Sequence, residues 1–226
     1  MDESRVLFED NHLIAIEKLP SDIVQGDKTK DKPLSEIVKT FLKEKYNKPG
    51  NVFCGVIHRI DRPVSGVIIF AKTSKALTRM NQLFQEKKIQ KTYWAIVKIK
   101  PATTKNRLQH YLQKNQKQNK SYPVQEEKGK KCELTYEVMS SSDHYHLLKI
   151  TPHTGRHHQI RCQLSAIGSP IKGDLKYGFD RSNKNGSIHL HAGNIEFVHP
   201  VSQERVSIVC PPPSESLWDF FKEFIH

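Results

Sequence analysis

A short charged run, His58-Arg59-Ile60-Asp61, lies between two apolar segments at 52–57 and 67–71. Apolar runs of this length, bounded by turn residues, indicate buried strands. A carboxylate held at the rim of a sheet between two such strands can act as a nucleophile or as a general base. The alternative is structural: the carboxylate caps a turn or pairs with Arg59 or Arg62. Taken alone, the run favours the structural interpretation.

The surrounding elements must position this carboxylate. Hairpin-like strands with helices between them, but no regular βαβ order, predict an α+β fold with a mixed, mainly antiparallel sheet and flanking helices. Residues 100–131 are rich in Lys, Gln and Asn and predict a hairpin or long loop inserted into one domain over 1–226. Helices are expected at 34–42, from 74, at 156–167 before Gly168, and from Ser214 to Phe224; strands are expected at 13–16, 92–99, 132–139, 145–150, 188–197 and 206–209.

Several segments, in chain order, resemble the RluA family of RNA pseudouridine synthases. The strongest is HRIDRPVSGVIIFAKT at 58–73, which is similar to the family's His-Arg-Leu-Asp segment with its Ser-Gly, apolar strand and Ala-Lys-Thr. The resemblance implies the pseudouridine synthase fold, with an active-site cleft across the sheet and without the N-terminal S4-like RNA-binding domain of many relatives. The other similar segments are EDNHLIAIEK at 9–18, KTYWAIV at 91–97, TGRHHQIRCQL at 154–164, GSPIKGDLKYG at 168–178 and LHAGNIEFVHP at 190–200.

The resemblance also implies roles for single residues. Asp61 takes the place of the catalytic aspartate, and Tyr93 that of the tyrosine that packs against the target base. Arg161 takes the place of the basic residue that pairs with the aspartate. Arg59 stands where family members can push an arginine toward the gap left by the extruded base. RNA or substrate contacts are expected from His58, Arg59, Arg62, Arg156, His157 and Gln159.

Three departures from the family pattern concern the loops. Val64 stands where a Thr is common before Ser-Gly, which removes one hydroxyl from the loop after Asp61. The early run Glu-Lys-Leu-Pro-Ser-Asp, at 17–22, replaces the common Lys-Pro-Ala-Gly, and Cys162-Gln163 replaces Val-His. These changes leave the carboxylate in place and leave RNA contacts from the early loop open.

The implied reaction explains these residue types. Pseudouridine formation breaks the bond between the ribose and a ring nitrogen of uracil, turns the base, and rejoins it through a ring carbon. No atoms are gained or lost, so no cofactor is expected. Asp61 would attack covalently or remove a ribose proton, and both routes stay open. A guanidinium such as that of Arg161 would offset the desolvation of a buried carboxylate, because it stays charged at working pH.

The charge balance favours a polyanionic partner. The chain has 36 Lys and Arg residues against 24 Asp and Glu residues, a formal net charge of +12. A field of that sign attracts polyanions over a Debye length of ~8 Å at physiological salt. RNA, ribosomal or transfer, is therefore the expected partner, and residues 100–131 are either a solvated surface or an RNA clamp. The target RNA and the modified uridine stay open.

Other sequence features bound the class of protein. The four cysteines are too far apart in sequence for a Cys-x-x-Cys pair, no signal peptide begins the chain, and no apolar run approaches a membrane span. The protein is expected to be a cytoplasmic monomer. No metal is expected, because four histidines that could share strand faces lack Cys or acidic partners at zinc-like spacing: His144, His146, His189 and His191. The competing functions are RNA binding without turnover, as in a folding or assembly factor, and a metal-dependent nuclease.

Overall fold

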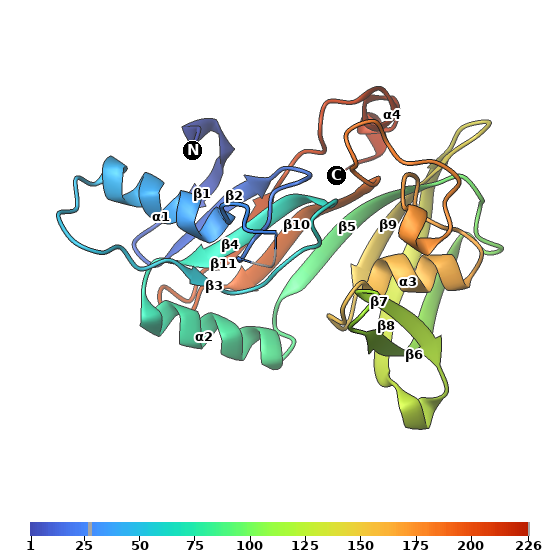
Figure 1. Ribbon diagram of the computed structural model, residues 1–226, viewed down its shortest axis with the longest axis horizontal. Helices are drawn as coiled ribbons and strands as arrows, with labels where there is room; N and C mark the ends of the chain where they lie inside the picture. Colours follow the sequence, from blue (N-terminus) through green and yellow to red (C-terminus); the bar gives the residue numbers. More distant parts are fainter. Residues whose placement is uncertain (27–28, 226) are drawn as a thin grey trace. The chain divides into compact units, whose positions relative to one another are not determined.

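The chain forms two compact units in the computed structural model, which describes residues 1–26 and 29–225. The first unit comprises Met1–Gln90 and Ala192–Pro211, and the second comprises Lys91–His191 and the segment from Pro212 onward. Figure 1 follows the chain by colour, so the orange-red strands of the first unit are seen to come from near the C-terminus. The expectation of one domain over 1–226 stays a prediction.

The first unit is a sheet with the strand order β1-β2-β4-β10, in which β3 adds to β4 and β11 adds to β10 (Figure 1). Helix α1 covers one face, where Leu34, Val38 and Leu42 pack with Ile14 and Phe70. Thr73 begins α2, because its Oγ1 accepts a hydrogen bond from the Ala76 amide at 3.1 Å. The elements are η1 (Glu3–Arg5), β1 (Val6–Glu9), β2 (Leu13–Lys18), α1 (Leu34–Lys45), β3 (Gly55–Val56), β4 (Ser65–Ala71), α2 (Ser74–Gln85), β10 (Leu190–Val198) and β11 (Arg205–Val209).

Strand β4 is buried along its whole length and needs a glycine at its second position. Gly66 has φ +126°, and a Cβ there would lie 2.3 Å from the carbonyl oxygen of Ala192 in β10. Gly66 therefore lies within the strand and permits the close approach of another backbone.

The second unit has the strand order β5-β9-β8-β6-β7, with antiparallel pairing throughout. Helix α3 packs on β6 and β7, and the C-terminal Trp218 and Phe221 cover Trp94, Ile96 and Leu147. Its elements are β5 (Gln90–Val97), β6 (Lys105–Asn115), β7 (Lys120–Val124), η2 (Glu126–Lys128), β8 (Lys130–Ser141), β9 (His146–Pro152), α3 (Gln159–Ala166), η3 (Leu175–Tyr177), α4 (Ser216–Phe220) and η4 (Lys222–Phe224).

The Lys- and Gln-rich segment 100–131 forms the hairpin β6–β7. This hairpin is part of the sheet, because β6 also pairs with β8 from Lys105 to Leu112. Leu108 and Leu112 are buried in it, although their neighbours in sequence are polar. The sparse apolar residues of this segment therefore mark the inner face of a strand.

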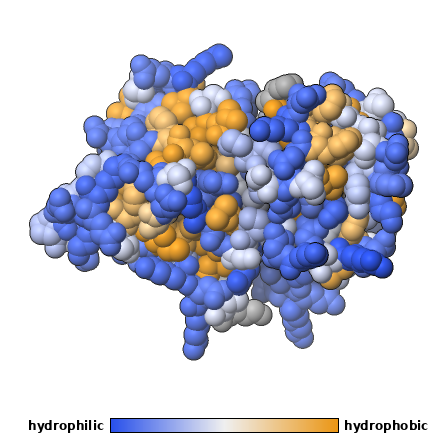
Figure 2. All heavy atoms as spheres, turned by 90° about the horizontal axis from the view of Figure 1, so that it is seen from above, coloured by the Kyte–Doolittle hydropathy of each residue, from blue (hydrophilic) through white to orange (hydrophobic). Residues whose placement is uncertain are grey.

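The fold class expected from the sequence is confirmed, since antiparallel strands with flanking helices make up both units. A cleft across the sheet stays a prediction. The prediction of a helix from Ser214 to Phe224 is wrong in length: α4 has five residues, begins after Glu215 without a side-chain cap, and leaves Phe220 59% exposed. Within the described ranges, no helix is long and apolar enough to cross a membrane. Figure 2 shows hydrophilic side chains projecting from the face in view, between smaller apolar patches.

Candidate active site

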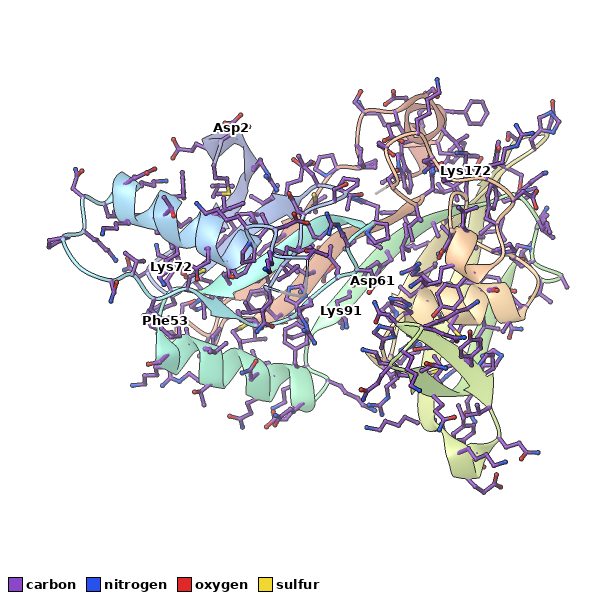
Figure 3. The ribbon with its side chains drawn as sticks, viewed as in Figure 1. Asp2, Phe53, Asp61, Lys72, Lys91 and Lys172 are labelled. Atoms are coloured by element: carbon purple, nitrogen blue, oxygen red, sulfur yellow. The ribbon has the colours of Figure 1, made fainter. Side chains whose placement is uncertain are left out.

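Asp61 lies on the loop between β3 and β4 in the first unit, where Figure 3 labels it. Its carbonyl oxygen accepts a hydrogen bond from the Val64 amide at 3.0 Å, which closes a turn over 61–64. The residue is partly exposed, whereas Val64 is buried. The turn thus directs the chain from a carboxylate at the rim into the buried strand β4.

A buried lysine donates hydrogen bonds to the backbone of this turn. Lys18 ends β2 and is fully buried, and its Nζ donates to the carbonyl oxygens of Leu19 at 3.1 Å, Arg62 at 3.0 Å and Val64 at 2.6 Å. Burial lowers the pKa of Lys18 to about 7, against the opposing effect of the charges of Asp22 and Asp61. No role for Lys18 was predicted from the sequence. The available signal was its position at the end of an apolar strand, which turns it toward the interior.

His58 anchors the other end of the loop. Its Nε2 accepts a hydrogen bond from the Ile69 amide at 3.1 Å, and its ring stacks on Phe84 with centroids 5.1 Å apart. Arg59 is exposed, and the exposed Arg62 pairs with Asp31 at 2.7 Å. The loop therefore presents cationic side chains to solvent on both sides of Asp61.

Tyr93 lies on β5 in the second unit, opposite Ile150 of β9. Its neighbours Trp94 and Ile96 alternate into the apolar core, so Tyr93 and Lys91 share the other face of the strand. Burial lowers the pKa of Lys91. A Cβ on Gly155 would lie 3.8 Å from Lys91 Nζ, which places this amine beside the loop before α3.

Arg161 lies within α3 and forms a buried, two-point ion pair with Asp174. Its Nε donates to Asp174 Oδ2 at 2.7 Å and its Nη2 donates to Oδ1 at 2.8 Å. The two side chains are 5% and 2% exposed, so water screens the pair little. Asp174 was missed in the sequence, although it lies in the GDLKYG segment that resembles the family. Its spacing from Arg161 carries no signal, because the two meet through a turn after the helix.

The loop before α3 is ordered by its own side chains. Gln159 Oε1 accepts from Thr154 Oγ1 at 2.7 Å and from the Arg156 amide at 2.9 Å, and its Nε2 donates to the Glu133 carbonyl at 3.0 Å. Gln159 is buried. This side chain therefore holds the loop, and a direct RNA contact from Gln159 stays a prediction.

Arg156 and the two histidines stand at the start of this helix. Arg156 is exposed, and its Nε donates to the Lys131 carbonyl at 3.1 Å. His157 lies 2.9 Å from Ser121 Oγ through Nδ1 and 3.1 Å from Asn119 Oδ1 through Nε2. His158 has φ +52°, and burial lowers its pKa to about 2. The expected helix at 156–167 thus begins three residues later, because a left-handed residue precedes it.

The described residues offer no metal site. Within 1–26 and 29–225, no group of three or more His, Cys, Asp or Glu side chains is placed to hold an ion. His189 and His191, which the sequence places on one face, both contact the Trp218 ring, with centroids 5.4 Å and 6.0 Å away. These histidines pack in the core of the second unit.

The two units define an α+β protein. The first carries Asp61 on a loop that Lys18 and His58 hold by hydrogen bonds, and the second carries the buried ion pair of Arg161 and Asp174. The RNA pseudouridylate synthase family matches residues 12–166. The chain belongs to this family, and it is an isomerase acting on RNA.

Individual relatives agree with this assignment. The chain is 32% identical over 216 residues to "Ribosomal large subunit pseudouridine synthase C" of Buchnera aphidicola subsp. Acyrthosiphon pisum, covering 92% of this chain and 67% of that protein. It is 29% identical to "tRNA pseudouridine synthase C" of Haemophilus influenzae, covering 90% of both chains. The chain thus spans about two thirds of the first relative and nearly all of the second.

A solved structure shares the fold. "Human RNA Pseudouridylate Synthase Domain Containing 4" aligns with a TM-score of 0.80 at 21% identity, over 97% of this chain and 92% of that chain. "Human RNA Pseudouridylate Synthase Domain Containing 1" aligns with a TM-score of 0.70 at 20% identity. At these identities the likeness concerns the fold.

Proposed function

We propose that this chain converts a specific uridine to pseudouridine in a structured RNA, ribosomal or transfer. The relatives named above act on both kinds of RNA, which supports this substrate class without choosing between them. The observation that carries the proposal is the braced Asp61 turn: a buried Lys18 and the anchored His58 hold a partly exposed carboxylate at the end of a buried strand.

Asp61 is the proposed catalytic group. The bond from the ribose to the ring nitrogen breaks, and a bond from the same ribose to a ring carbon forms. Asp61 either adds to the ribose and leaves again or removes a ribose proton and returns it, so atoms balance in both routes. The ring carbon that joins the ribose loses its proton and the released ring nitrogen gains one, and the Tyr93 hydroxyl is the proposed group that takes up the proton from the carbon.

Arg161 is the proposed electrostatic partner of Asp61. A guanidinium has donors for more than one carboxylate, and the fork to Asp174 uses Nε and Nη2. A cation fixed in advance stabilises developing negative charge without reorganising during the reaction. That Asp61, Tyr93 and Arg161 act in the same reaction is part of this proposal.

RNA binding is proposed to depend on the exposed cations near these residues. Arg59, Arg62 and Arg156 are exposed and would contact phosphates, which position the RNA without reading its sequence. Extruding the target base costs about a few kcal/mol, and stacking on Tyr93 would return about 1–3 kcal/mol. The proposal includes a cytoplasmic monomer that needs no metal or other cofactor.

The test compares Asp61→Asn with Asp31→Asn, which removes an exposed carboxylate from a surface pair. Pseudouridine would be mapped in ribosomal and transfer RNA incubated with each purified variant, and RNA affinity would be measured alongside. We expect Asp61→Asn to form no product while its affinity stays within a few-fold, and Asp31→Asn to remain active.

Full turnover by Asp61→Asn would refute the mechanism. Tight RNA binding without product from the unaltered chain would instead support the competing function, an RNA-binding protein without turnover. Inactivation by a chelator would revive the metal-dependent alternative.

A further inference from the structure

Tyr177 contacts the proposed active-site arginine and the β6–β7 hairpin at the same time. It is the last residue of η3 and is 4% exposed. The Arg161 guanidinium lies over its ring, with Cζ 5.1 Å from the centroid. Lys120, the first residue of β7, also lies over this ring, with Nζ 5.1 Å from the centroid. All of these residues belong to the second unit.

The Tyr177 hydroxyl binds the backbone of the hairpin. It accepts a hydrogen bond from the Ser121 amide at 2.9 Å and lies 3.3 Å from the Ser121 carbonyl oxygen. It also lies 3.0 Å from Nδ1 of His158. Burial raises the pKa of the Tyr177 phenol above its usual range, so the hydroxyl stays protonated. It can therefore donate one hydrogen bond while accepting another.

Tyr177 is itself fixed by α3. Ser165 Oγ donates to the Tyr177 carbonyl at 2.7 Å, one turn of helix beyond Arg161. Cys162 of the same helix donates through Sγ to the Ser121 carbonyl at 3.3 Å. The helix that carries Arg161 and the strand that carries Ser121 thus meet on one buried side chain.

The ring supplies a constraint that Asp174 does not. Asp174 engages two donors in the plane of the guanidinium, which fixes direction within that plane. An aromatic ring against the face of a guanidinium restrains its tilt and stabilises its charge. In-plane and facial contacts together define the orientation of the group.

We propose that Tyr177 is a positioning residue that orients Arg161 with its ring and holds the β6–β7 hairpin with its hydroxyl. The proposal rests on the proposed role of Arg161 in the active site. It gives the lysine-rich hairpin a defined attachment, because the Tyr177 hydroxyl holds Ser121 beside the helix that carries Arg161.

Two substitutions separate the ring from the hydroxyl. Tyr177→Phe keeps the ring and removes the hydroxyl, while Tyr177→Met removes both and still fills space. The matched control is Tyr136→Phe, which removes a buried hydroxyl bonded to Thr103 Oγ1 at 2.9 Å in the same unit. Turnover of RNA, hydrogen exchange of the Ser121 amide, and trypsin cleavage at the hairpin lysines would be measured for each variant.

We expect Tyr177→Phe to speed exchange of the Ser121 amide and cleavage of the hairpin by about tenfold, with kcat within about threefold of normal. We expect Tyr177→Met to show the same loosening and, in addition, a kcat about tenfold lower at saturating RNA. An unchanged Ser121 exchange rate in Tyr177→Phe would overturn the hairpin half of the proposal. A normal kcat in a folded Tyr177→Met would overturn the arginine half.

A measurement on the unaltered chain covers the case in which Tyr177→Met does not fold. Nuclear magnetic resonance of the Arg161 Nε–H reports rotation of the guanidinium, which we expect to be slow. Fast rotation would overturn the proposal. The resonance and exchange measurements need no substrate, so a failure of the proposed function, seen as an absence of product, is distinguishable from a failure of this inference.

Discussion

The ammonium group of Lys18 lies 2.6 Å from the carbonyl oxygen of Val64, inside the turn that follows Asp61. The same nitrogen also donates to the carbonyl oxygens of Arg62 and Leu19. One buried side chain on β2 therefore satisfies three backbone acceptors at the base of the proposed catalytic loop. Removing it takes this donor from the buried Val64 carbonyl, whereas the carbonyl oxygens of Arg62 and Leu19 keep hydrogen bonds from the amides of Ser21 and Asp22.

Lys18→Met is expected to lower kcat, because the Asp61 turn loses its brace. Stability should depend on pH in a defined direction. The folded-state pKa of about 7 lies below the usual 10.5, so the unfolded chain binds more protons between these values. The stability of the unaltered chain relative to Lys18→Met should therefore rise with pH above about 7, by up to about 1.4 kcal/mol per pH unit.

Urea unfolding of both proteins at several pH values from 6 to about 9 checks this slope. Lys39→Met, which removes a partly exposed lysine from α1, is the control and should show no such trend. A difference between Lys18→Met and the unaltered chain that stays constant with pH would contradict the prediction.

Asp174→Asn is expected to destabilise the chain by about 3–5 kcal/mol, because it leaves the buried Arg161 charge with a neutral partner. Urea unfolding measures this loss. Asp180→Asn is the control, since the carboxylate of Asp180 is exposed and its contact with Lys98 is long, at 3.5 Å. Equal stability of the two variants would show that the ion pair between Asp174 and Arg161 does not stabilise the fold.

Gly66→Ala is expected to destabilise the chain by about 2–5 kcal/mol, because the added Cβ would clash with the Ala192 backbone at an unfavourable φ. The melting temperature of the purified variant gives the measurement. Gly26→Ala is the control, since a Cβ there meets nothing within 4 Å. A normal melting temperature for Gly66→Ala would mean that β4 and β10 can separate at no cost.

Tyr93→Phe is expected to lower kcat by about a hundredfold or more if the hydroxyl transfers the ring proton, with RNA affinity preserved by the remaining ring. Single-turnover kinetics and a binding titration separate the two effects. Tyr136→Phe serves as the comparison, and its rate should be normal. An unchanged rate in Tyr93→Phe would deny the hydroxyl a part in the chemistry.

Much of the fold could be predicted because periodicity reports burial directly. The first helix shows its apolar positions at helical spacing, and the apolar run of β4 ends two residues before Thr73, which caps α2. The length of the last helix could not be predicted, because the spacing of its aromatic residues fits a helix but does not show which of them are buried. Trp218 and Phe221 are buried in the apolar core, whereas Phe220 is exposed.

The proposed site was predicted only in part. The residues that would react lie in segments that resemble a family, so Asp61, Tyr93 and Arg161 could be named. Their supports could not, because Lys18, Asp174 and Tyr177 act through contacts between residues distant in sequence. A lysine that binds carbonyl groups inside a protein looks, in a sequence, like any charged residue at the end of a strand.

Strand β7 is the last strand in its sheet, and it carries Pro123 as its fourth residue. Proline has no amide hydrogen, so a neighbouring chain cannot extend the sheet there without losing a bond. Lys120, the first residue of the strand, carries a charge that another chain would have to bury in order to pair with β7. A shortened chain without β6 and β7 would leave the edge of the long strand β8 unpaired. We expect such a chain to aggregate, because unpaired edge strands can pair with other chains.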